Sequence, residues 1–313
     1  MKHIFIDPNT SLVRAGWRIL LFTIVFILLN LGLSIFVRAM LGSLRGGSLI
    51  SFFILGVTAT ISAFFTRKYL EKDSISTLGI SFNMLAIKDL LIGICISAVV
   101  MSGMYALLYS LGLIQFEGFS WWLESTENSG FTSESLIIFF GVFIQFSIVA
   151  WWEELAFRGI VLQNICKGLN LTWGVVLSIL FFGLIHAGNP GSTVLSTVLI
   201  MLISTKLVYA YLKTEQLWLP IGLHLGWNFF QSSLFGFSSS GHSSPSLIKQ
   251  MPLGLDWLSG GEFGVENSVL IIPFVPITWI LIHVWVNRSR KIPEQKCYPK
   301  NLQQFVPSIP PIH

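Results

Sequence analysis

A charged triplet stands inside an otherwise apolar stretch of the chain. Glu153, Glu154 and Arg158 occur in the run Trp-Trp-Glu-Glu-Leu-Ala-Phe-Arg, and ionisable residues within membrane helices are costly and mark candidate functional sites. Glu154 and Arg158 are four residues apart, so they share a helix face and can form an ion pair. Glu153 is rotated by about 100° from Glu154 and lacks such a partner. Glu153 is therefore a candidate general base, unless all three charges lie at the membrane surface in contact with water.

Two further apolar stretches carry polar residues at the same four-residue spacing. Phe182 and His186 share one helix face, and His224 and Asn228 share another. Glycines on both sides of His224 leave room for a close approach of another helix. Taken singly, each of these polar residues could be a helix-packing residue that forms hydrogen bonds to a neighbouring helix. Taken together, they could face one cavity.

Side chains from three predicted helices could thus meet at one site. With a rise of 1.5 Å per residue, Glu153 and His224 both lie about 10 Å from the cytoplasmic edge of the membrane, and His186 lies somewhat deeper. A carboxylate and an imidazole can hold and deprotonate water, whereas a second imidazole and an amide can donate hydrogen bonds to an oxyanion. This combination describes peptide hydrolysis by activated water. The alternative is zinc bound by Glu153, His186 and His224; no metal is favoured, since the chain has no HExxH pair.

The composition predicts the environment in which these residues must be positioned. Apolar residues make up 53% of the chain and charged residues only 11%, against about 25% in soluble domains. Nineteen basic and fifteen acidic residues are too few to cover a soluble fold of 313 residues, whereas a bilayer tolerates an apolar exterior. The basic residues form no single patch, so nucleic acid is not an expected partner.

Eight apolar runs are long enough, or nearly so, to span about 30 Å of hydrocarbon. We therefore predict an all-α fold, a polytopic membrane bundle of about eight transmembrane helices in one domain over residues 1–290. The Pro-rich tail, 291–313, is expected to be disordered. The eight predicted helices are Trp17–Val37, Leu49–Phe65, Leu90–Leu113, Leu136–Phe157, Leu171–His186, Thr193–Leu212, Leu217–Phe235 and Val269–Val286.

The distribution of basic residues predicts the orientation of the helices. If the N-terminus lies inside, sixteen Lys and Arg residues fall in or beside inside segments and three in outside segments. This asymmetry places both termini in the cytoplasm. The segment Gly236–Ser268 is then exported, and its Ser- and Gly-rich part, Ser238–Gly261, is expected to be a mobile loop.

At this point the residues resemble a known family, the CPBP intramembrane proteases. The family includes the CAAX prenyl endopeptidases and the bacterial abortive-infection, bacteriocin-processing proteins. The similarity covers 136–235, about a third of the chain, and consists of three motifs in the family's order: Glu153-Glu154-xxx-Arg158, Phe182-xxx-His186 and His224-xxx-Asn228.

The resemblance implies an endopeptidase with eight helices and a cavity open toward the cytoplasm. It implies that Glu153 activates water with His186, that His224 and Asn228 form the oxyanion side, and that Glu154, Arg158 and Phe182 are supporting. The expected partners are the lipid bilayer and a peptide or membrane-protein substrate, and the expected location is a bacterial plasma membrane. The family is named for metalloproteases, but the role of metal is disputed.

Two non-enzymatic functions remain as alternatives. Some relatives act as membrane scaffolds or regulators, but a scaffold need not keep Glu153, His186, His224 and Asn228 together. A small transporter could use the same polar residues as a proton relay. Transporters usually show internal repeats or broken helix pairs, which this sequence lacks.

Overall fold

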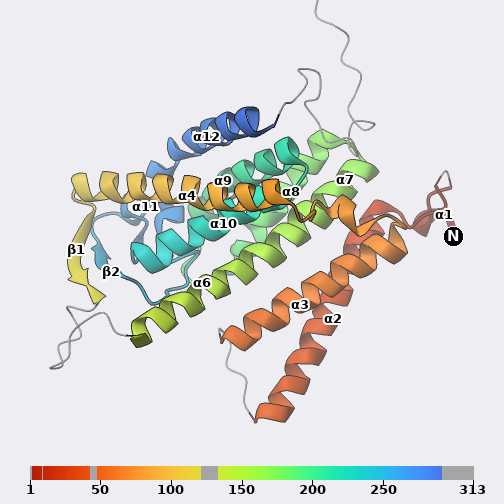
Figure 1. Ribbon diagram of the computed structural model, residues 1–313, viewed down its shortest axis with the longest axis horizontal. Coiled ribbons are helices and arrows are strands. Elements are labelled where there is room, and N and C mark those ends of the chain that lie inside the picture. Colours follow the sequence, from red (N-terminus) through yellow and green to blue (C-terminus); the bar gives the residue numbers. More distant parts are fainter. Residues whose placement is uncertain (1, 9, 43–47, 121–132, 291–313) are drawn as a thin grey trace, which may run out of the picture.

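The chain folds into a bundle of long helices that run side by side (Figure 1). The computed structural model describes residues 2–8, 10–42, 48–120 and 133–290. Six helices in this part of the chain are long and apolar enough to cross a membrane: Ala15–Leu41, Leu49–Leu70, Met84–Ser110, Leu136–Gly168, Val194–Thr214 and Val269–Ser289. Leu171–His186 is a shorter apolar helix, and the helix Trp218–Phe229 lies within the seventh predicted segment, Leu217–Phe235. The prediction of a mostly helical membrane protein is confirmed.

The elements have the following bounds. The helices are α1 (Lys2–Phe5), α2 (Ala15–Leu41), α3 (Leu49–Phe65), α4 (Met84–Ser110), α6 (Ser133–Glu154), α7 (Gln163–Gly168), α8 (Leu171–His186), α9 (Val194–Thr214), α10 (Trp218–Phe229), α11 (Asp256–Ser259) and α12 (Phe274–Ser289). Three π-helical turns are η1 (Thr66–Leu70), η3 (Leu155–Leu162) and η4 (Phe230–Leu234). Four 3₁₀ turns are η2 (Ile75–Leu78), η5 (Gly261–Phe263), η6 (Val265–Asn267) and η7 (Val269–Ile271). The strands are β1 (Ile114–Phe119) and β2 (Ile248–Pro252).

Two sequence predictions about these elements were wrong. The fourth apolar helix was expected to end at Phe157, but it continues through η3 and α7 to Gly168. Its charged residues do not end it, because Arg158 pairs with Glu154 of the same helix and both are bonded to other helices, Arg158 to Ser204 and Glu154 to His224. The segment Ser238–Gly261 was expected to be a mobile loop. It contains β2, which pairs antiparallel with β1, so this segment has fixed neighbours. The predicted disordered tail, 291–313, lies outside the described residues.

The central contact of the bundle is between α4 and α10. Every residue of α10 from Leu219 to Phe229 is buried. The helix backbones meet at glycines: a Cβ on Gly222 would lie 2.2 Å from the carbonyl oxygen of Leu90, and one on Gly93 would lie 2.6 Å from the amide nitrogen of Leu223. Small residues allow such close packing where lipid gives no hydrophobic driving force between helices. The glycines therefore fix the depth and rotation of α10, which carries two of the candidate site residues.

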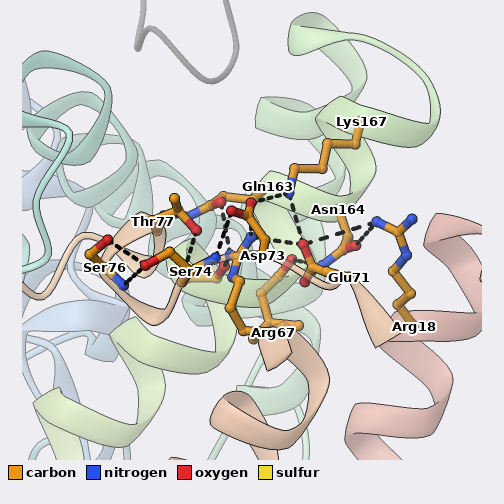
Figure 2. Close-up of polar contacts among 12 residues, drawn as sticks. Arg18, Arg67, Glu71, Asp73, Ser74, Ser76, Thr77, Gln163, Asn164 and Lys167 are labelled. Atoms are coloured by element: carbon orange, nitrogen blue, oxygen red, sulfur yellow. Dashed lines mark hydrogen bonds and ion pairs between the residues drawn. The ribbon is translucent and has the colours of Figure 1, made fainter. Parts of the chain in front are cut away.

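A buried polar cluster joins the N-terminal hairpin of α2 and α3 to α7 (Figure 2). The carboxylate of Glu71 accepts hydrogen bonds from Arg67 at 2.7 Å, Lys167 at 2.8 Å and Asn164 at 3.0 Å. Arg18 of α2 lies 4.0 Å from the same carboxylate. One acidic group is thus shared by basic groups from three segments, and it holds this end of the hairpin against the bundle.

We expect Gly222→Ala to lower the stability of the protein, because the new methyl group meets the backbone of α4 and neither helix can move alone. Overpacking of this kind costs about 1–3 kcal/mol. The measurement is the thermal melting temperature of purified variants in detergent.

Gly32→Ala is the matched control, because a Cβ at Gly32 of α2 would meet nothing within 4 Å. It should leave the melting temperature unchanged or raise it slightly, since alanine favours helix over glycine by up to about 1 kcal/mol. If the two variants had the same melting temperature, the contact between α4 and α10 would be looser than the Cβ distances at Gly222 indicate.

Candidate active site

The two adjacent glutamates lie in the last turn of α6, directly before the π-helical turn η3. Their side chains are buried, with Glu153 7% exposed and Glu154 fully enclosed. The Nη1 of Arg158, within η3, donates to the Oε1 of Glu154 at 3.0 Å, as the four-residue spacing predicts. π-Helical turns inside α-helices frequently occur at functional sites, and this one begins at the residue after Glu154.

Arg158 is held by three neighbours. Besides the bond to Glu154, its Nη2 donates to the hydroxyl of Ser204 on α9 at 2.8 Å. Its guanidinium carbon lies 4.5 Å from the centroid of the Phe182 ring. The centroid of the Phe182 ring is 4.9 Å from that of His186 and 5.9 Å from that of His224. Phe182 therefore contacts both imidazole rings as well as the guanidinium of Arg158, and it helps to set the distance between the two histidines.

His224 is oriented by Glu154, a contact that the sequence did not predict. Its Nδ1 lies 2.8 Å from the same Oε1 that accepts from Arg158. A carboxylate paired with a guanidinium has no proton to give, so the Nδ1 of His224 must be the donor in this bond. The opposite nitrogen, Nε2, lies 3.8 Å from the Oε2 of Glu153. Glu154 thus fixes both the orientation and the tautomer of the ring.

His186 is oriented in the same way by the backbone. Its Nδ1 lies 2.7 Å from the carbonyl oxygen of Phe182, which can only accept, so Nδ1 carries the proton. The Nε2 of His186 lies 4.0 Å from the Oε2 of Glu153. This carboxylate oxygen is buried and has no hydrogen-bond partner among the described residues. Both Nε2 atoms therefore flank one free carboxylate oxygen, at distances that one bridging water molecule can span.

The carboxylate and both imidazoles open into a cavity of about 1010 Å³. Asn228 is 8% exposed, lines this cavity and makes no hydrogen bond to another described residue. The wall also includes Ser239, Ser240 and His242–Pro245, from the segment that is predicted to be exported. The expected opening toward the cytoplasm stays a prediction, since it depends on the orientation of the chain in the membrane. All four residues predicted to be catalytic line the cavity.

Several basic residues of the orientation count are buried within the protein. Arg67, Arg158 and Lys206 were counted with the inside segments, but they are 0%, 0% and 1% exposed. Lys206 lies within α9 and lines the cavity. Sequence reasoning did not place it at the site, although a lysine within an apolar helical run is the signal that could have identified it.

The zinc alternative can be tested against the geometry. Each Nδ1–H donates outward, to a carbonyl or to a carboxylate, which is the arrangement that zinc-binding histidines usually have. The donor types of Glu153, His186 and His224 therefore suit zinc. Within the described part of the chain, however, no group of three or more His, Cys, Asp or Glu side chains is arranged so that it could hold a metal ion. The participation of a metal stays a prediction.

The fold and the site define a helical membrane protein with a carboxylate–histidine centre buried between its helices. Residues 135–230 match the family model described as Rce1-like, the type II CAAX prenyl endopeptidase Rce1-like family. The match runs from α6 to the start of η4 and includes Glu153, Glu154, Arg158, Phe182, His186, His224 and Asn228, so the resemblance seen in the three motifs is confirmed. It supports the fold of an intramembrane CAAX-type endopeptidase and implies a protease-type enzyme. No curated protein and no solved structure matches the chain.

We expect Arg158→Ala to lower stability, because it leaves the carboxylate of Glu154 buried without its cation. Breaking a buried pair in this way typically costs about 3–5 kcal/mol. The measurements are the folded yield in detergent and the melting temperature. Ser204→Ala is the control on the same guanidinium, and it should cost about 1–3 kcal/mol, since only one hydrogen bond is lost. Unchanged melting of Arg158→Ala with complete loss of activity would place Arg158 in the chemistry instead.

Proposed function

We propose that the chain is an intramembrane endopeptidase that hydrolyses a peptide bond of a peptide or membrane-associated protein. Water is activated by Glu153 with His186, and His224 with Asn228 stabilises the oxyanion. The observation that carries this proposal is the convergence of the Nε2 atoms of His186 and His224 on the free Oε2 of Glu153, at 4.0 and 3.8 Å, within a buried cavity.

The hydrolytic step uses the spacing of these atoms. A water molecule between Glu153 and His186 donates one hydrogen to the carboxylate and the other to the Nε2 of the imidazole. As the water oxygen attacks the substrate carbonyl carbon, Glu153 takes a proton from it. Collapse of the tetrahedral intermediate breaks the C–N bond, and Glu153 returns the proton to the leaving amine. Acid and base are thus the same residue in successive steps.

The oxyanion side is formed by groups on α10. Asn228 lines the cavity, and no described residue occupies its side-chain amide, so its Nδ2 can donate to an oxyanion. His224 already uses its Nδ1–H for Glu154, so a hydrogen bond from Nε2 to the oxyanion requires that the ring carry both protons. The carboxylate of Glu154 balances the charge of that imidazolium. Glu154 is therefore a positioning residue for the oxyanion donor as well as the partner of Arg158.

We propose a reaction without metal, because these side chains suffice as base, orienting partner and oxyanion donors. If zinc binds, Glu153, His186 and His224 would hold it, and it would polarise the attacking water and the substrate carbonyl. The proposed setting is a bacterial plasma membrane with both termini in the cytoplasm, and the lipid bilayer and a peptide or membrane-protein segment are the partners. No nucleic acid is involved.

Glu153→Gln tests the catalytic role. The amide keeps the size of the side chain but cannot accept the proton from water, and removal of a general base typically lowers the rate by about 10²–10⁴-fold. Stability should change little, since a neutral amide is cheaper to bury than a carboxylate. Proteomics of membranes with the wild type or with Glu153→Gln should reveal uncleaved precursors, which then serve as substrates for the purified variants.

Further variants separate the roles at the site. His186→Ala and His224→Ala should be similarly inactive, and combining either with Glu153→Gln should add little, since the residues act as one unit. Asn228→Ala should lose about 10²–10³-fold, the effect of one oxyanion donor. Glu262→Gln makes the same change at an exposed site outside the cavity and should retain full activity. If the Glu153→Gln variant folds and supports every cellular phenotype of the wild type, the protease proposal is wrong and a scaffold function replaces it.

Elemental analysis of the purified, active protein tests the metal-free reaction. We expect zinc well below one equivalent per chain and activity that persists after treatment with a chelator. Stoichiometric zinc, with activity lost on chelation and restored by added zinc, would overturn the metal-free mechanism. The chelated protein should be melted in parallel, so that unfolding is not mistaken for loss of a catalytic ion.

A further inference from the structure

A lysine in the middle of α9 is buried without a partner for its charge. Lys206 is 1% exposed, and its Nζ has no hydrogen-bond partner among the described residues. An ammonium group has three hydrogens to donate, and a buried charge without a partner is strongly unfavourable. A charged residue inside a membrane segment is therefore expected to serve a function.

The neighbours of Lys206 hold its side chain in place but accept no hydrogen bond from its Nζ. Its Nζ lies 2.9 Å from the centroid of the Trp227 ring, a cation–π contact that replaces part of the lost hydration. The Nε1 of Trp227 donates to Glu266 at 3.0 Å, so the ring cannot turn away. The lysine is thus presented on a fixed aromatic surface at the wall of the cavity.

The carboxylates that act on Lys206 electrostatically are already engaged by other groups. They belong to Glu154 and Glu266. Glu154 binds Arg158 and His224, as described above. Glu266 accepts from Trp227 and, through its other oxygen, from the backbone N–H and the hydroxyl of Ser240 at 2.7 and 2.8 Å. Within the described residues, the Nζ of Lys206 is therefore left for a group that enters the cavity.

We propose that Lys206 binds a carboxylate of the peptide substrate and so sets its register at the hydrolytic centre. The inference rests on the proposed function, since Lys206 lines the same cavity as Glu153, His186 and His224. A peptide offers a carboxylate in two places, at its C-terminus and on Asp or Glu side chains. Either would meet an ammonium in a site shielded from water, where a charged hydrogen bond is strong. The rest of the substrate would contact the mainly apolar wall.

Binding without turnover tests this proposal. The probes are acetyl-trileucine with a free C-terminal carboxylate, its C-terminal amide, and acetyl-Leu-Asp-Leu amide, titrated against the full chain carrying Glu153→Gln in detergent. We expect the carboxylate-bearing probes to bind about 10–100-fold more tightly than trileucine amide, as one charged hydrogen bond predicts. If acetyl-trileucine binds more tightly than acetyl-Leu-Asp-Leu amide, the carboxylate comes from the C-terminus of the substrate. If the order is reversed, it comes from an acidic side chain.

Lys206→Met in the same background should abolish that preference while leaving the affinity for the amide unchanged. The variant should fold, because an apolar side chain replaces an unpartnered buried charge. Lys213→Met makes the same change near the end of α9, outside the cavity, and should keep the full preference. Equal binding of acid and amide by the parent chain, or a preference that survives Lys206→Met, would overturn the proposal.

The two proposals fail in different ways. A chain that prefers carboxylates through Lys206 but cleaves no peptide would refute the endopeptidase and keep the binding site. A chain that cleaves peptides with the same KM for acid and amide forms, before and after Lys206→Met, would keep the endopeptidase and refute the role of Lys206. If both hold, Lys206→Met should raise KM for the acid form about 10-fold or more, with kcat little changed.

Discussion

One carboxylate oxygen organises the centre of this protein. The Oε1 of Glu154 accepts from the guanidinium of Arg158 at 3.0 Å and from the imidazole of His224 at 2.8 Å. A buried carboxylate is stable only when it is paired and hydrogen-bonded, so the cation is required before the imidazole can be held. The arginine in turn contacts the ring of Phe182, whose carbonyl orients His186. The orientation of His224 therefore depends on a single ion pair within one helix, whereas that of His186 depends on the backbone of α8.

The division of labour between the adjacent glutamates follows from this arrangement. Helical geometry sends neighbouring side chains in directions about 100° apart. One glutamate faces the packed interior, where Arg158 and His224 engage it, and the other faces the cavity with a free oxygen. Neither role could be filled by the other residue without rotating α6. The π-helical turn that follows places Arg158 against Ser204 and Phe182 while retaining its bond to the preceding turn.

Local rules predicted the helices and part of the site. Apolar run lengths are set by membrane thickness, so the spans could be located, and four-residue spacing was enough for the pair of Glu154 and Arg158. The contact of Glu154 with His224 joins residues 70 positions apart and depends on glycines that let α10 approach α4. Lys206 was misplaced for a related reason: counting basic residues treats each lysine as a surface marker, whereas burial depends on packing. The pairing of β1 with β2 was missed because neither strand has a partner nearby in the chain.

The cavity is not enclosed by protein alone. Ile19, Phe22 and Phe26 of α2 form part of its wall, yet only 6% of the most apolar stretch of this helix is buried in the structure. The polar cluster around Glu71 fixes α2 at one end, and lipid must cover most of the remaining surface. The width of the cavity is therefore partly a property of the bilayer. Acyl-chain length and lateral pressure act on its shape through α2, so that a change of lipid changes one wall of the cavity.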